Sequence, residues 1–398
     1  MSSSRPLVFE SAHALPDDAA AATLAGRVWR PDVQGPSVVV LRDGAVHDVS
    51  RRFPTIRDLC EEEDPVTALR STEGEVVGSL AEILANTPIE RRDPDRPWLL
   101  APVDLQVVKA AGVTFAISLL ERVIEERARG DLEAASAIRQ EVQRLVGDDL
   151  QRLKPGSPEA EALKAVLVER GAWSQYLEVG IGPDAEIFTK APPMASVGTL
   201  MDAGLLPSSN WNNPEPEVVL MVASSGRIVG ATLGNDINLR DLEGRSALLL
   251  GKAKDNNASC TIGPFLRLFD DGFDLNDVRR MTVTLVIEGE DGFRLDGESS
   301  LSQISRDPAD LVAQMIGPHH QYPDGAALFL GTMFAPIEDR DTPGQGFTHK
   351  MGDLVTIASP RLGRLVNRMR HTHECEPWTF GTGALMRNLA ARGLLSRS

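Results

Sequence analysis

Three acidic residues in two short segments are the strongest candidates for chemistry in this chain. Glu215 and Glu217 flank Pro216, and Asp236 follows the short apolar run 228–233. Residues two apart in a strand point to the same face, so Glu215 and Glu217 can reach one point. Two like charges on one face repel unless a cation lies between them, and carboxylate oxygens suit Mg²⁺, Mn²⁺ or Ca²⁺. The spacing predicts a divalent-metal site, against the alternative of two exposed acids on an edge strand.

The apolar runs around these acids predict the element that would bring them together. Residues 218–223 and 228–233 are typical of strands, and the segment 224–226, Ser-Ser-Gly, is typical of a turn. A hairpin of this kind would return Asp236 to the side of Glu215. The sequence therefore predicts one site formed from both segments.

Lys254 follows the acids in the chain and is a candidate base. A lysine beside a metal ion can accept a proton if burial and the cation lower its pKa. The alternative is a solvated loop lysine, which is the commoner fate of this residue type.

The order of the remaining elements predicts an α+β protein. Residues 1–98 are expected to form a small N-terminal α+β domain, with a β-hairpin at 38–49. The charged, proline-rich segment 90–97 marks the boundary, and residues 99–398 form the second domain. A helical insertion is predicted at about 117–170, and short strands follow it in a sandwich-like or roll-like arrangement.

Composition limits the classes of partner. The chain has 398 residues and a net charge of −16, which disfavours nucleic acid and anionic membranes as partners. Its three cysteines form neither a disulfide framework nor a CxxC zinc pattern. There is no apolar run of membrane-spanning length and no signal-peptide pattern. We therefore expect a cytoplasmic protein with a small-molecule substrate.

Several motifs, in order along 99–398, resemble those of the fumarylacetoacetate hydrolase superfamily. They are Pro-Glu-Pro-Glu at 214–217, Gly-x-x-x-Gly-Asn-Asp at 230–236, Lys254 with Gly263-Pro264, Phe-Thr-Lys at 188–190, Leu-Gly-Thr at 330–332 and Gly-Asp-Leu-Val at 352–355. The resemblance implies a mixed β-sandwich or roll and a homodimer or homotetramer. It also implies Mg²⁺, or Mn²⁺ or Ca²⁺, held by Glu215, Glu217 and Asp236.

Position 118 departs from the hydrolases of this superfamily. Their Gly-x-Asn-Tyr-x-x-His segment supplies a histidine that activates water, whereas this chain has Ser118 in the corresponding stretch 112–121. A neutral hydroxyl is a poor general base for water at pH 7. Hydrolysis of a carbon–carbon bond is therefore disfavoured.

Further segments resemble one branch of the superfamily, the bacterial 2-keto-3-deoxy-pentonate dehydratases of non-phosphorylating D-xylose or L-arabinose catabolism. These are Thr-Phe-Ala-Ile-Ser at 114–118, Trp-Ser-Gln-Tyr-Leu-Glu at 173–178, Glu-Ile-Phe-Thr-Lys at 186–190 and Trp-Asn-Asn-Pro-Glu at 211–215. The resemblance implies a hydro-lyase that yields 2,5-dioxopentanoate. The alternatives are a 2,4-diketo-3-deoxy sugar-acid hydrolase and a non-catalytic, metal-stabilised interaction protein.

Elimination of water requires a base and an acid. Lys254 is the expected base at C3, and either Glu186 or Glu121 is the acid at the C4 hydroxyl, provided that burial raises its pKa toward 7. Glu121 could instead belong to a salt-bridged helix face, and Glu186 could simply pair with Lys190.

The remaining site residues are expected to hold the substrate. Ser118 and Thr332 would bind its carboxylate or hydroxyls, and Asn235 lies within the Gly-Asn-Asp motif that the resemblance assigns to the site. Lys190 would add positive charge, although a structural ion pair is an equal alternative for it.

Overall fold

The computed structural model describes residues 7, 14–128, 153–169, 171, 173–334, 336, 338–341 and 346–395. Its strands are β1 (Leu24–Arg30), β2 (Gly35–Arg42), β3 (Ala45–Asp48), β4 (Glu75–Ser79), β5 (Trp98–Leu100), β6 (Val107–Gly112), β7 (Glu186–Ala191), β8 (Asp202–Leu205), β9 (Asn212–Asn213), β10 (Pro216–Val222), β11 (Ile228–Asp236), β12 (Asn238–Leu239), β13 (Cys260–Leu268), β14 (Thr282–Glu288), β15 (Arg294–Ser300), β16 (Ala326–Phe329), β17 (Leu354–Ser359) and β18 (Gly363–His371). Its α-helices are α1 (Ile56–Glu61), α2 (Pro65–Ser71), α3 (Leu80–Ala85), α4 (Ala116–Ala128), α6 (Pro158–Glu169), α7 (Gln175–Ile181), α8 (Arg240–Glu243), α9 (Leu250–Lys254), α10 (Leu275–Arg279), α11 (Pro308–Met315) and α12 (Thr382–Ala391).

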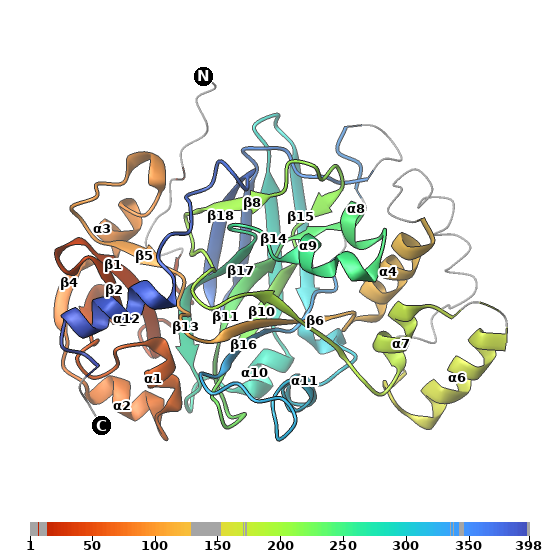
Figure 1. Cartoon of the computed structure of the whole chain (residues 1–398), viewed down its shortest axis with the longest axis horizontal. Coiled ribbons are helices and arrows are strands. Elements are labelled where there is room, and N and C mark those ends of the chain that lie inside the picture. Colours follow the sequence, from red (N-terminus) through yellow and green to blue (C-terminus); the bar gives the residue numbers. More distant parts are fainter. Residues whose placement is uncertain are drawn as a thin grey trace.

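Two large sheets form the centre of the molecule (Figure 1). The first follows the order β4-β3-β2-β1-β13-β11-β10-β16-β6-β7, with β5 beside β1. The second has the order β15-β14-β17-β18-β8, and a short pair, β12-β9, lies apart from both. Most neighbours are antiparallel, whereas β16–β6 and β18–β8 are parallel. This mixed sandwich with helices at both ends confirms the α+β class expected from the sequence.

Strand β10 is buried on both faces, which explains the apolar run at 218–222 that follows Glu217. Val218, Leu220 and Val222 belong to the core between the two sheets. Val219 and Met221 point the other way, into a core shared with α1 and α2 of the N-terminal region. Pro216 is the first residue of this central strand, a position that proline tolerates because it is at the strand start.

The N-terminal region joins the central sheet directly. Strands β2 and β3 form the expected hairpin, with Asp43 and Gly44 at positive φ in the turn. Strand β1 pairs with β13, Leu24 opposite Arg267, so hydrogen bonds continue from the N-terminal strands into the strands that carry the acids. The division of the chain at residue 98 stays a prediction.

Helices α4, α6 and α7 lie together at one end of the sandwich (Figure 1). They share a small core of their own, with Leu119, Leu167 and Leu177 among its members. The predicted helical insertion at about 117–170 corresponds in part to α4 and α6, and its middle lies outside the described residues. Within the described ranges, no helix is long and apolar enough to cross a membrane.

Candidate active site and metal centre

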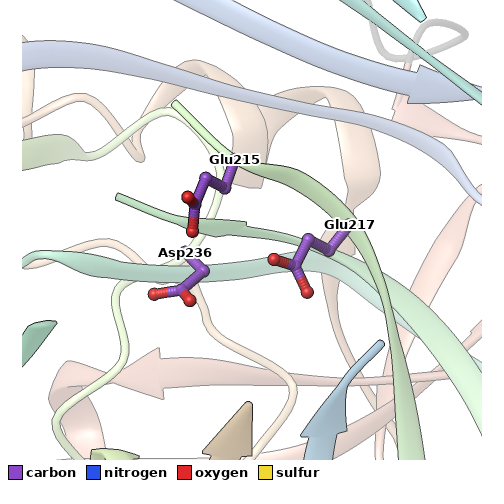
Figure 2. A group of neighbouring side chains, drawn as sticks. All are labelled: Glu215, Glu217 and Asp236. Atoms are coloured by element: carbon purple, nitrogen blue, oxygen red, sulfur yellow. The ribbon is translucent and has the colours of Figure 1, made fainter. Parts of the chain in front are cut away.

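The β10–β11 hairpin brings Glu215, Glu217 and Asp236 together, as the sequence predicts. The strands are antiparallel with Pro216 opposite Asn235, and the backbone N–H of Asp236 donates to the carbonyl of Glu215 at 3.1 Å. One carboxylate oxygen from each acid lies within 4.8 Å of the others. Figure 2 shows the three side chains converging on one region from the start of β10 and the end of β11.

The three carboxylates are buried, with exposed fractions of 5% for Glu215 and 2% for Glu217 and Asp236. Burial, together with the charges of Asp236 and Glu215, raises the pKa of Glu217 well above its usual range. A divalent cation at this point would relieve the repulsion, and an all-carboxylate oxygen set suits a hard ion. The donor set therefore fits the divalent metal that the sequence predicts.

Gly331 supports one of these carboxylates. Its backbone N–H donates to Oε2 of Glu217 at 2.6 Å. The glycine has φ of +87°, and a Cβ there would lie 2.0 Å from Oγ1 of Thr114. Only glycine fits this close approach without displacing Thr114, whose hydroxyl donates to the carbonyl of Leu330.

Two lysines neutralise Asp236 from different sides. Nζ of Lys254 lies 2.9 Å from its Oδ2, and Nζ of Lys190 lies 2.9 Å from its Oδ1. Burial opposes ionisation of Asp236, but the two ammonium groups outweigh it and lower its pKa. Lys254 also contacts Oε2 of Glu215 at 2.5 Å. Burial disfavours the charged form of Lys254, yet Asp236 and Glu215 prevail and raise its pKa.

Arg122 of α4 adds a third cation to the carboxylates. Its Nη2 lies 2.5 Å from Oε1 of Glu215, and its Nη1 lies 2.8 Å from Oε2 of Glu243. Both oxygens of Glu215 therefore have a cationic partner, since Lys254 binds the other. Arg122 was not among the site residues expected from the sequence, although it lies one helical turn after Ser118 and on the same face of the helix.

A pocket of about 490 Å³, partly open to solvent, adjoins the carboxylates. We call it the metal pocket. Its lining includes Glu215, Glu217, Asp236, Lys254, Glu186, Ser118, Thr332, Arg122, Arg240, Glu243, Phe188 and Phe334. The structure thus gathers seven of the predicted site residues around one space.

Glu186 is the candidate acid that the structure places in the metal pocket. It begins β7 opposite Gly112 of β6, and a Cβ at Gly112 would lie 2.1 Å from its Oε2. Burial and the nearby charge of Glu243 raise the pKa of Glu186 to about 7, against the opposing effect of Arg122 and Lys254. A group with this pKa is suited to donate a proton near neutral pH. Glu121 belongs to α4, but its side chain lies outside the described part of the structure.

Ser118 and Thr332 both reach the metal pocket. The hydroxyl of Ser118 donates to the carbonyl of Phe115 at 2.9 Å, and Oγ1 of Thr332 accepts from the N–H of Phe334 at 3.1 Å. Each hydroxyl oxygen retains hydrogen-bonding capacity for a further group. Their expected role as substrate contacts is compatible with this placement and stays a prediction.

Lys190 and Asn235 are placed behind the carboxylates and are not among the residues that line the metal pocket. Nζ of Lys190 is fully buried and donates to the carbonyls of Lys254 and Ile237, at 2.7 and 3.1 Å. Oδ1 of Asn235 accepts from the N–H of Glu215 at 2.9 Å. In this arrangement both buried side chains contact the segments that carry the three carboxylates, and their expected role in substrate binding stays a prediction.

Arg240 and Glu243 of α8 complete the charged wall of the metal pocket. Nε of Arg240 donates to Oδ1 of Asn213 at 2.7 Å, and its guanidinium lies 5.6 Å from the ring centre of Trp211. Trp211 and Asn213 precede Glu215 in the chain, so Arg240 of α8 contacts the segment that leads into the three carboxylates. The sequence analysis assigned no role to these two charged residues.

Comparison with known proteins supports the resemblance drawn from the motifs. Residues 222–370 match the model of the fumarylacetoacetate (FAA) hydrolase C-terminal domain. A probable 2-keto-3-deoxyxylonate dehydratase of Haloferax volcanii is 31% identical over 192 residues, 48% of this chain and 62% of that protein. A 2-dehydro-3-deoxy-D-arabinonate dehydratase of Saccharolobus solfataricus is 28% identical over 185 residues, 46% of this chain and 58% of that protein. The match spans less than two thirds of either relative.

Solved structures share the fold over most of this chain. A 2-keto-3-deoxy-D-arabinonate dehydratase complexed with magnesium and 2,5-dioxopentanoate superposes with a TM-score of 0.59 at 20% identity, over 88% of this chain and 99% of that one. Fumarylacetoacetate hydrolase from Exiguobacterium antarcticum gives a TM-score of 0.51 at 16% identity, over 88% and 100%. These likenesses confirm the expected fold.

Proposed function

We propose that this chain, whose residues 222–370 match the model of the fumarylacetoacetate (FAA) hydrolase C-terminal domain, is a divalent-metal-dependent hydro-lyase. Its substrate is a 2-keto-3-deoxy-pentonate, and its product is 2,5-dioxopentanoate, a step of non-phosphorylating pentose catabolism. The relatives that match in sequence are named as dehydratases of such sugar acids. The observation that carries the proposal is the presence of Glu186, Lys254 and three buried carboxylates around one pocket.

Glu215, Glu217 and Asp236 would hold the ion, with Mg²⁺ the first choice and Mn²⁺ or Ca²⁺ alternatives. When bound, the ion supplies Lewis acidity toward the carboxylate and keto oxygens of a 2-keto acid, which makes the C3 protons more acidic. Because the three carboxylates and Lys254 are buried, the electrostatic interactions among them are stronger than they would be in water.

Lys254 is the proposed base at C3. Its ammonium form is stabilised by Glu215 and Asp236, the same carboxylates that would bind the ion. A divalent cation on those carboxylates would withdraw that stabilisation and lower the pKa of Lys254. The amine would then accept the C3 proton.

Glu186 is the proposed acid at C4. In its protonated form it would give its proton to the departing C4 hydroxyl, which leaves as water. Elimination leaves a C3=C4 double bond. Loss of a proton from C5 and return of one to C3 gives the enol of the C5 aldehyde, which tautomerises to 2,5-dioxopentanoate. Ser118 and Thr332, on the wall of the same pocket, would orient the substrate's oxygens.

The test supplies purified protein and Mg²⁺ with two substrates in separate reactions. From 2-keto-3-deoxy-xylonate we expect 2,5-dioxopentanoate, detected by oxidation with an aldehyde dehydrogenase. From the corresponding 2,4-diketo acid we expect no turnover. Pyruvate and glycolate from the diketo acid, without 2,5-dioxopentanoate from the first substrate, would establish the hydrolase alternative instead.

A further inference from the structure

A second cavity lies away from the metal pocket, between the N-terminal strands and the segment 376–380. It encloses about 1010 Å³ of empty space, part of it open to solvent. Its lining includes Trp29, Trp98, Trp378, Phe380, Arg27 and Met194. We call it the tryptophan cavity. No described residue lines both cavities.

Aromatic side chains are concentrated in the tryptophan cavity. Three of the five tryptophans of the chain line it. Trp29 and Trp98 face each other across β1 and β5 and stack with ring centres 5.6 Å apart, and Phe380 meets Trp29 edge-on at 5.0 Å. Trp378 is 48% exposed although it is large and apolar. Such surfaces favour a planar, apolar ring as ligand.

Arg27 gives the tryptophan cavity a buried cation. Its side chain is 5% exposed, and its Nη1 donates to the carbonyls of Val103 and Ala101 at 2.5 and 3.3 Å. Its Nη2 donates to Sδ of Met194 at 3.6 Å. A thioether is a weak acceptor, so an oxygen of a ligand would be a better partner for this nitrogen. Asp104 lies 3.7 Å from Nε, on another edge of the guanidinium.

The outer wall of the tryptophan cavity is held in place by polar contacts. Glu376 pairs with Arg92 at 2.9 Å, and the guanidinium of Arg92 lies 4.7 Å from the ring centre of Trp98. Nδ2 of Asn257 donates to the carbonyl of Glu376 at 3.4 Å. Nε1 of Trp378 donates to the carbonyl of Phe380 at 3.1 Å. Because these contacts fix the wall without a ligand, the cavity is pre-formed, and a ligand would lose little binding free energy in ordering it.

We propose that the tryptophan cavity is a second ligand site, which takes a small molecule with one planar aromatic ring system and one carboxylate. The ring lies against Trp29 and Trp378, and the carboxylate accepts from Arg27. The Arg92–Glu376 pair leaves the rim without net charge, and of the buried pair Arg27–Asp104 only the guanidinium lines the cavity, so the group that a ligand meets there is a cation. The site is independent of the proposed dehydration, because its residues are separate from those of the metal pocket.

The experiment measures binding of 2-naphthoate to the full chain by calorimetry, without Mg²⁺ or keto acid. Two comparison compounds separate the recognised groups: 2-naphthamide keeps the ring without the charge, and cyclohexanecarboxylate keeps the charge without the planar ring. We expect 2-naphthoate to bind at least tenfold more tightly than either. Comparable affinity for all three compounds, or no binding of any, would overturn the proposal.

Variants test whether 2-naphthoate binds in the tryptophan cavity. Trp378→Ala should weaken 2-naphthoate binding at least tenfold, whereas Trp173→Ala, which removes a tryptophan that does not line the cavity, should leave it unchanged. Arg27→Lys should reduce the preference for 2-naphthoate over 2-naphthamide. Retained binding in Trp378→Ala contradicts the site. A second result would also contradict it: the protein does not bind 2-naphthoate but forms a concentration-dependent dimer that Trp378→Ala abolishes. The surface would then bind a second copy of the chain.

Discussion

Arg122 is bonded to a proposed metal ligand. Its guanidinium joins Oε1 of Glu215 to Oε2 of Glu243, at 2.5 and 2.8 Å, and so links α4 to β10 and α8. A metal ion and an arginine on the same carboxylate repel each other. Either the ion and Arg122 both contact Glu215 at a cost in binding free energy, or the guanidinium of Arg122 leaves Glu215 when an ion binds.

This competition predicts that Arg122→Gln increases the affinity for Mg²⁺ in the absence of substrate. Removal of one partly screened like charge should tighten binding roughly fivefold, about 1 kcal/mol. Calorimetric titration of Mg²⁺ measures it directly. Arg127→Gln, five residues later on the same helix, is the matched control and should not change the affinity. Weaker Mg²⁺ binding in Arg122→Gln would show that the arginine positions Glu215 for the ion.

The carboxylate triad is tested by Glu215→Gln combined with Glu217→Gln. At an Mg²⁺ concentration of about 100 times Kd, the wild-type protein should gain about 2.7 kcal/mol of stability, whereas this double variant should gain none. The measurement is thermal unfolding with and without the ion. The control is Glu159→Gln with Glu161→Gln on α6, a pair with the same spacing and charge that is exposed. Equal stabilisation of the triad variant would exclude these residues as ligands.

The pKa of Glu186, about 7, predicts a pH limit on catalysis. The proposed acid must carry its proton, which it holds below this pH and loses above it. We expect kcat/KM to fall about tenfold per pH unit above pH 7. Glu186→Gln should remove this dependence and lower kcat by about 10²- to 10⁴-fold. If Glu121→Gln abolishes this fall in kcat/KM at high pH and Glu186→Gln does not, then Glu121 and not Glu186 is the acid.

Glu243 is expected to influence the pH at which kcat/KM begins to fall, which we call the alkaline limb of the pH profile. Its negative charge helps to raise the pKa of Glu186. Glu243→Gln removes that charge and frees Arg122 from one partner. Both changes lower the pKa of Glu186, so the limb should move to lower pH while the rate at low pH is largely kept. The pH profile of kcat/KM is the readout, and an unchanged profile would contradict the predicted effect of Glu243 on the pKa of Glu186.

Lys190 is expected to matter for folding more than for substrate binding. Lys190→Met leaves Asp236 with one cation fewer and leaves two buried carbonyls without their donor. The free energy of unfolding should fall by about 3 kcal/mol or more. Denaturant unfolding measures this loss. The control is Lys109→Met on β6, where Nζ donates to the hydroxyl of Thr189 and lies 5.2 Å from the ring centre of Tyr322; it should change stability by about 0.5 kcal/mol or less.

The hairpin that carries the acids could be predicted because its information is local. Strand patterns, a Ser-Ser-Gly turn and the two-residue period were sufficient to bring Asp236 to Glu215. The partners of the carboxylates could not be predicted in the same way. Arg122 lies 93 residues before Glu215 in the chain and 121 before Glu243, and only tertiary packing of α4 against the sheet determines that they meet.

Lys190 shows why residue type alone did not settle a role. Substrate contact and a structural ion pair are equal alternatives for this residue in the sequence, because neither pattern nor spacing reveals whether an ammonium group faces a pocket or a carbonyl. The N-terminal strands illustrate the same limit. Their own hairpin was predictable, whereas the pairing of Leu24 with Arg267 joins residues separated by most of the chain.

That pairing has a consequence for engineering. Strand β13 hydrogen-bonds with β1 along one side and with β11 along the other, and on the β11 side Asp236 stands opposite Cys260. Deleting the first 98 residues would remove the neighbour that covers β13 at Leu266 and Arg267, and would leave that end of the strand with an open edge. Open edges of this kind recruit strands from other molecules. We therefore expect a chain without these residues to aggregate more readily than the full chain.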